Sequence, residues 1–172
     1  MTHVFEALGP RFLEILISPF GRADMVWGIV PLYFGWIVNE LTSAKPSYHT
    51  AIQTGFSFMW AGAQWCYQYL SSNPTTADGF NLRIFLAVNV TVTVFVLTFG
   101  LAAFVCGIRR KYPKYAKFLG HTRFSNYFMI TIYPMQAHYL AWTWDRVAAI
   151  AIFALPIWLL LHFGLMPLRN QK

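Results

Sequence analysis

The most informative absence in this sequence is charge. Asp, Glu, Lys and Arg make up 11% of the 172 residues, whereas soluble domains carry about 25%. Hydrophobic residues make up 57% of the chain. A soluble domain of this length could not cover its surface with 13 basic and 6 acidic side chains. The composition therefore predicts an integral membrane protein, and the length predicts a single membrane domain over residues 1–172.

Cysteines and clustered metal ligands are also scarce. Cys66 and Cys106 both fall in apolar segments, which argues against a disulfide framework, and neither belongs to a metal-ligand spacing. No acidic residue lies near the centre of an apolar run, so a proton-coupled transporter would lack its usual carrier. No serine has the G-x-S-x-G context of a hydrolase nucleophile. We therefore expect a non-enzymatic protein without a bound metal.

Histidine is the remaining route to a cofactor, because two histidines on facing helices could hold a haem iron. Of the five histidines, only His138 and His162 lie well inside apolar runs. They fall on opposite sides of the bilayer midplane, about 14 Å apart in depth. One iron could not bridge them, so no cofactor is expected. Glu40 and His49 form an acid–histidine pair at one bilayer boundary, which is either a small active site or a solvated pair at helix ends.

Basic charge, by contrast, is concentrated in one segment. No acidic residue occurs between Asp78 and Asp145. Six of the thirteen Lys and Arg residues lie close together there: Arg109, Arg110, Lys111, Lys114, Lys117 and Arg123. A basic segment beside an apolar run marks the cytoplasmic side of a membrane, which predicts a cytoplasmic loop over 109–125. Its expected partners are anionic lipid headgroups or an acidic cytoplasmic protein, and no nucleic acid is expected.

Apolar runs predict the fold. A helix needs about 20 apolar residues to cross the hydrocarbon core, and a lone strand would leave its backbone unpaired in lipid. We expect an all-α, polytopic membrane bundle of five transmembrane helices, at residues 25–41, 50–70, 82–108, 126–144 and 147–166. Residues 4–19 hold too short an apolar run to cross. They predict an amphipathic interfacial helix, broken near Gly9 and Pro10, or alternatively a helix packed on the end of the bundle.

The segment 126–144 is the weakest of the five, because Pro134, Gln136 and His138 interrupt it. It either crosses the membrane or re-enters it. If it crosses, nine Lys and Arg residues lie inside and four outside, whereas a re-entrant segment gives eight inside and five outside. The positive-inside rule therefore favours five crossings with the N-terminus outside.

Four polar side chains fall inside the predicted helices near one another in depth. A rise of about 1.5 Å per residue places Gln136 near the midplane, and Gln64, Asn89 and His138 in the outer half of the bilayer. Two explanations remain open. The four side chains line a small polar pocket, or they join helices through hydrogen bonds that contribute about 0.6 kcal/mol each.

Two functions follow from these observations. Many aromatic and small side chains, with no soluble domain and no buried charge, lead us to expect a structural or accessory subunit of a larger membrane complex. Its partners would be lipids and other membrane subunits, or further copies of the same chain. The alternative is a small transporter or membrane ligand-binding protein that uses the polar pocket.

Overall fold

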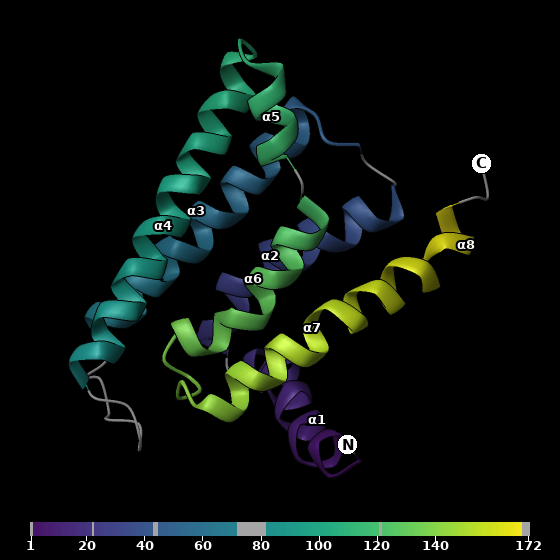
Figure 1. The fold of residues 1–172 in the computed structure, drawn as a ribbon. Coiled ribbons are helices and arrows are strands. Elements are labelled where there is room, and N and C mark those ends of the chain that lie inside the picture. The colour runs from purple at the N-terminus through teal and green to yellow at the C-terminus, as the bar shows by residue number, and fades with distance from the viewer. Residues whose placement is uncertain (1, 22, 43–44, 72–81, 121, 170–172) are drawn as a thin grey trace.

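The structure is a computed structural model, and it describes residues 2–21, 23–42, 45–71, 82–120 and 122–169. Every regular element in these ranges is helical, as predicted. In chain order the elements are α1 (Thr2–Ile17), η1 (Ser18–Gly21), α2 (Ala23–Leu41), α3 (Tyr48–Ser71), α4 (Leu82–Arg109), α5 (Pro113–Leu119), α6 (Thr122–Gln136), α7 (Trp144–Gly164) and α8 (Met166–Arg169). Helix α5 lies at one end of the bundle and α1 at the opposite end (Figure 1). Arg22 and Lys172, which enter the charge count, lie outside the described residues.

The longest helices, α3 and α4, form a hairpin and lie side by side along their length (Figure 1). Glycines allow their backbones to approach closely. A Cβ atom built on Gly55 would lie 2.5 Å from the backbone nitrogen of Phe104. One built on Gly107 would lie 2.9 Å from the backbone nitrogen of Ile52. Small residues at such contacts are typical of helix pairs in membranes, where van der Waals packing drives association.

Helix α6 is the centre of the other half of the bundle and contacts α1, α2, α3 and α7. Its residues are almost continuously buried from Met129 onward. This burial explains the weak apolar character of the segment, because α6 faces neighbouring helices more than lipid. The helix ends at Gln136, not at Trp144 as the sequence predicted, and turns and bends follow it. Its 15 residues cover only about 22 Å.

Helix α1 packs against α7. The side chains of Phe12 and Ile15 are buried, and the Phe12 and Phe153 ring centroids are 5.9 Å apart. Glu14 on α1 also forms an ion pair with Arg146 on α7, at 3.1 Å. The helix runs unbroken through Gly9 and Pro10, so the predicted break is wrong. These contacts correspond to the alternative of a helix packed on the end of the bundle.

In the described part of the chain, two helical stretches are long and apolar enough to cross a membrane: Ala87–Arg109 and Trp144–Leu168. A third candidate joins Glu6–Gly21 to Met25–Leu41 through a bend of 116°. These spans support an integral membrane protein. The arrangement with five crossings stays a prediction.

The predicted basic loop 109–125 is largely helical. It contains the whole of α5 and the first turn of α6. Pro113 starts α5, where its missing N–H group is not needed for an intrahelical bond. Four of the six cations lie in helices, at the end of α4, in α5 and at the beginning of α6, whereas Arg110 and Lys111 lie in the link between α4 and α5.

Candidate functional site

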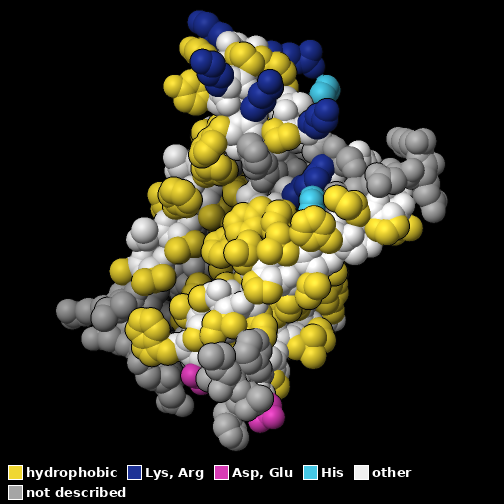
Figure 2. All heavy atoms as spheres, turned by 45° about the vertical axis from the view of Figure 1, so that its right-hand side comes forward, with side chains coloured by type: hydrophobic (Ala, Val, Ile, Leu, Met, Phe, Trp, Pro, Cys, Tyr) yellow, Lys and Arg dark blue, Asp and Glu magenta, His cyan; other side chains and the backbone are white. Residues whose placement is uncertain are grey.

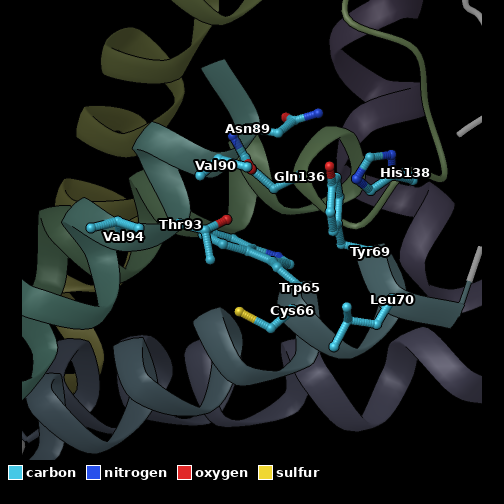
Figure 3. A pocket seen from close by; sticks show the side chains of 10 residues that line it. All are labelled: Trp65, Cys66, Tyr69, Leu70, Asn89, Val90, Thr93, Val94, Gln136 and His138. Carbon is cyan, nitrogen blue, oxygen red and sulfur yellow. The ribbon is translucent and has the colours of Figure 1, made fainter. Parts of the chain in front are cut away.

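A cavity of about 110 Å³ lies between α3, α4 and the end of α6 (Figure 3). We call it the α3–α4–α6 cavity. Its lining residues are Trp65, Cys66, Tyr69 and Leu70 from α3, Asn89, Val90, Thr93 and Val94 from α4, and Gln136 and His138 from α6 and the turn after it. The cavity lies in the half of the α3–α4 hairpin that is remote from α5, because it involves the end of α3 and the beginning of α4.

The structure brings together three of the four polar residues that the sequence singled out. Asn89, Gln136 and His138 all line the α3–α4–α6 cavity, although Asn89 is distant in sequence from the other two. Gln64 is not among the lining residues. Its Cγ atom instead lies beside Gly28 on α2, where a Cβ would be only 2.6 Å away. The predicted cluster is therefore a group of three, and Gln64 packs against α2.

Several polar atoms of the residues that line the cavity have no hydrogen-bond partner in the described part of the chain. These are Nε1 of Trp65, Nδ2 of Asn89, and both Nε2 and Oε1 of Gln136. All three residues are nearly fully buried, and Gln136 is only 1% exposed. Leaving a buried polar group unpaired costs about 1–3 kcal/mol, so native proteins rarely do it without a reason. Three donors and one acceptor therefore belong to residues that line one cavity.

One polar atom of the group does have a structural partner. Oδ1 of Asn89 accepts a hydrogen bond from Nε1 of Trp142, at 2.9 Å. Trp142 lies in the segment between α6 and α7. This bond fixes the orientation of the Asn89 amide and leaves its Nδ2 group without a partner among the described residues.

His138 reaches the cavity from an unusual backbone conformation. Its φ angle is 59°, in the left-handed region that non-glycine residues seldom adopt. The turn is held by backbone hydrogen bonds from Tyr139 and Leu140 to the carbonyl oxygen of Pro134. The His138 ring packs against the Tyr69 ring, with centroids 5.7 Å apart. Strained backbone of this kind is frequent at binding sites.

The rest of the wall is apolar or weakly polar. None of the ten lining residues is Asp, Glu, Lys or Arg. An unpaired ion in such a place would lose its hydration without a fixed counter-charge. The amide and indole groups can instead donate hydrogen bonds to a neutral acceptor. The chemistry of the site therefore suits an uncharged polar molecule.

A second polar feature lies elsewhere, between α2 and α7. The carboxylate of Glu40 contacts Nδ1 of His162 at 3.0 and 3.2 Å, and Glu40 is fully buried. The sequence paired Glu40 with His49, but the structure pairs it with His162 and leaves His49 exposed. The expectation that the protein buries no charge is also wrong. The cause is that α2 and α7 meet near their C-terminal ends, a contact that the order of segments does not reveal.

Three further residues of the site were not singled out from the sequence: Trp65, Tyr69 and Trp142. Each was visible only as part of a generally aromatic composition. A Trp or Tyr inside an apolar run signals an interfacial belt as readily as a binding wall. Only the packing of α3 against α4 and α6 separates these two roles.

Within the described residues, no group of three or more His, Cys, Asp or Glu side chains could hold a metal ion. Comparisons of the chain with protein-family models, with curated proteins and with solved structures give no match.

Proposed function

We propose that this protein is a small integral membrane protein that binds an uncharged polar molecule in the α3–α4–α6 cavity. The observation that carries the proposal is that Trp65, Asn89 and Gln136, which together have four polar atoms without a partner among the described residues, all line one cavity. A bound carbonyl compound would accept hydrogen bonds from the indole and amide N–H groups. A donor on the same molecule would satisfy Oε1 of Gln136.

The size of the cavity limits the ligand. Sites for drug-sized molecules have about 300–1,000 Å³, whereas this cavity has about 110 Å³. A small amide or a compound of similar size fits these dimensions. Because the best small ligands gain at most about 1.5 kcal/mol per non-hydrogen atom, we expect an affinity no tighter than about micromolar for a five-atom ligand.

The observations favour ligand binding over helix–helix bonding at Gln136. A side chain that joins helices must make a hydrogen bond, and Gln136 makes none within the described part of the chain. The accessory-subunit hypothesis relies instead on the exposed apolar faces of α4 and α7, such as Phe95 and Leu160. Lipid tails would cover these faces equally well. We therefore prefer the ligand-binding protein, with the accessory subunit of a membrane complex as the competing proposal.

The test compares two buried carboxamides on α6. Gln136 and Asn126 are both buried, and both amide groups lack a hydrogen-bond partner, but only Gln136 lines the cavity. Gln136→Leu removes the cavity amide. Asn126→Ala is the matched control, with a smaller side chain because Gly35 lies against this amide.

The readout is ligand-observed NMR on purified protein in detergent, with three probes of similar size: N-methylacetamide, acetate and ethylammonium. We expect N-methylacetamide to bind the wild type and the Asn126→Ala variant, and binding to be lost in Gln136→Leu. Acetate and ethylammonium should show no binding that depends on Gln136. The absence of binding by all three probes, together with stoichiometric membrane partners in a mild-detergent purification, would overturn the proposal in favour of the accessory subunit.

The proposed topology has five crossings, by α2, α3, α4, α6 and α7, with the N-terminus outside and α5 cytoplasmic. The positive charge around α5 supports this orientation. Helix α6 is short for a crossing, but it is surrounded by α1, α2, α3 and α7. Irregular backbone after its end at Gln136 is tolerated at membrane depth where protein covers it. In this topology the cavity lies in the outer half of the bilayer.

A further inference from the structure

Helix α5 is held firmly against the beginning of α3. Ala116 is buried, and a Cβ built on Gly120 would lie 2.5 Å from Oγ1 of Thr50. The hydroxyl of Tyr48 donates a hydrogen bond to the backbone oxygen of Arg110, at 2.8 Å. These contacts tie both ends of the segment to α3. The orientation of α5 is therefore set by its packing on α3, and the face of α5 that is turned away from α3 is exposed.

The outward face combines cations with large aromatic side chains. Lys114 and Lys117 are exposed, and Tyr115 and Phe118 beside them are 64% and 69% exposed. The approach to the helix continues this surface with further exposed residues: Arg109, Arg110, Lys111 and Tyr112. We call these eight residues the α5 basic surface. Dark blue side chains gather with yellow ones at this end of the molecule (Figure 2).

Among the residues that the structure describes, the ion pairs involve Arg11, Arg146 and His162, and none joins a carboxylate to a cation of this surface. The sequence has no acidic residue between Asp78 and Asp145. Nζ of Lys111 lies over the Tyr112 ring, 5.7 Å from its centroid. Such a contact leaves the charge in place. Five cations therefore lie on one small surface, which attracts anions.

The position of the α5 basic surface relates it to the membrane. The apolar span Ala87–Arg109 ends at the first cation of the surface. A helix that leaves the hydrocarbon core at Arg109 delivers the next residues directly into the headgroup layer. Aromatic side chains with a polar edge, and long basic side chains beside them, are the residues that occupy this layer.

We propose that the α5 basic surface is a binding site for the headgroups of anionic phospholipids in the leaflet next to the C-terminal end of α4. The lysines and arginines contact the lipid phosphates. Tyr112, Tyr115 and Phe118 insert at the level of the glycerol and upper acyl chains. Since α5 is attached to α3 and α4, bound lipids also fix the depth of the α3–α4 hairpin in the bilayer.

Two other partners would use some of this chemistry. An acidic protein would need the cations but would not need exposed aromatic residues at membrane depth. Free phosphate would bind the cations without selecting a lipid. Because the surface lies at the end of a membrane span, its position favours a lipid partner. Binding of an acidic protein or of free phosphate would be a separate outcome of the experiment.

The test measures lipid selectivity in reconstituted bilayers. The full chain is placed in phosphatidylcholine vesicles that contain spin-labelled phosphatidylglycerol or spin-labelled phosphatidylcholine. The motionally restricted fraction of each label is read by electron paramagnetic resonance. We compare the wild type with the triple variant Lys111→Gln, Lys114→Gln, Lys117→Gln, and with Arg11→Gln. Arg11 is an exposed cation on α1, at the other end of the bundle.

We expect the wild type to prefer phosphatidylglycerol, and the triple variant to lose at least about fivefold of this preference, which corresponds to the contribution of one surface cation. Arg11→Gln should keep it. A second variant, Tyr115→Ser with Phe118→Ser, retains every cation and should weaken the selectivity less than the triple variant. Salt should reduce the selectivity, because exposed charges are screened.

Three results would overturn the proposal. Equal restriction of the two labels by the wild type would show that the surface does not select anionic lipid. Loss of selectivity in Arg11→Gln but not in the triple variant would move the site to the other end of the molecule. Loss of selectivity when inorganic phosphate, but not the same ionic strength of chloride, is added would assign the surface to free phosphate. None of these results depends on whether the α3–α4–α6 cavity binds a ligand.

Discussion

The carboxylate of Glu40 on α2 lies 3.0 Å from Nδ1 of His162 on α7. Glu40 is fully buried, and the His162 ring stacks on Trp158, with centroids 5.2 Å apart. Trp158 in turn contacts Phe124 on α6 in an edge arrangement, at 5.4 Å. These contacts join α2, α6 and α7 at one place. They matter because α7 otherwise packs mainly on α1 and α6.

The first prediction concerns this pair. His162→Phe keeps an aromatic ring for Trp158 but removes the imidazole nitrogen that contacts the buried Glu40 carboxylate. Removing one hydrogen-bond partner of a buried polar group costs about 1–3 kcal/mol, so we expect a loss of that order in the free energy of unfolding. The double variant Glu40→Leu with His162→Phe should lose clearly less than the sum of the single variants. Denaturant unfolding in detergent micelles measures the free energy of unfolding of the wild type, the two single variants and the double variant. Additive losses would show that the two side chains do not interact.

The second prediction separates the two amides of the cavity. Asn89→Leu leaves Nε1 of Trp142 without its acceptor, so it should lower the free energy of unfolding by about 1–3 kcal/mol. Gln136→Leu removes an amide that has no partner, and without ligand it should leave stability unchanged or raise it. Thermal unfolding of both variants in the absence of ligand is the measurement. Equal destabilisation by both would assign Gln136 to helix–helix bonding.

The third prediction concerns the approach of α3 to α4. Gly55→Ala places a Cβ against the backbone of Phe104, which forces the helices apart and should cost about 1–3 kcal/mol. Gly9→Ala is the control. It also lies in a helix, and nothing is within 4 Å of its Cβ position, so alanine should stabilise by about 0.5–1 kcal/mol. A harmless Gly55→Ala change in thermal unfolding would contradict the close hairpin.

The fourth prediction concerns the topology. If α6 crosses the membrane, the C-terminus lies on the same side as α5, and if α6 is re-entrant, it lies on the opposite side. A reporter fused after Lys172, active on only one side of the membrane, distinguishes the two cases. A reporter inserted after Lys114 marks the side of α5. We expect both reporters to give the cytoplasmic signal, and opposite signals would contradict the five-crossing topology.

Much of the fold could be predicted from the sequence because it depends on local properties. A run of apolar residues in a chain with little charge has one stable arrangement in lipid, since only a helix pairs its own backbone groups. The helices at 82–108 and 147–166 were found on this basis, close to α4 and α7. Helix ends were harder to predict. The segment 126–144 ends early because backbone bonds to Pro134 replace the last helical turn, and these bonds need the tertiary surroundings of the turn.

The candidate site was predictable in part for a related reason. Depth in the bilayer can be estimated from residue position, so Asn89, Gln136 and His138 could be grouped before their contacts were known. Depth does not give the direction of a side chain around its helix. Gln64 has a suitable depth but packs beside Gly28, whereas Trp65, the next residue, lines the cavity.

The sequence by itself predicted a helical chain with membrane spans, and it placed six of the thirteen Lys and Arg residues in one segment. These properties follow from composition and from the cost of unpaired backbone in lipid. Only the tertiary structure decided which polar groups meet. The Glu40–His162 pair and the cavity of Trp65, Asn89 and Gln136 join helices that are far apart in the chain. Their formation depends on crossing angles and helix rotation, which are set by the packing of all the helices together.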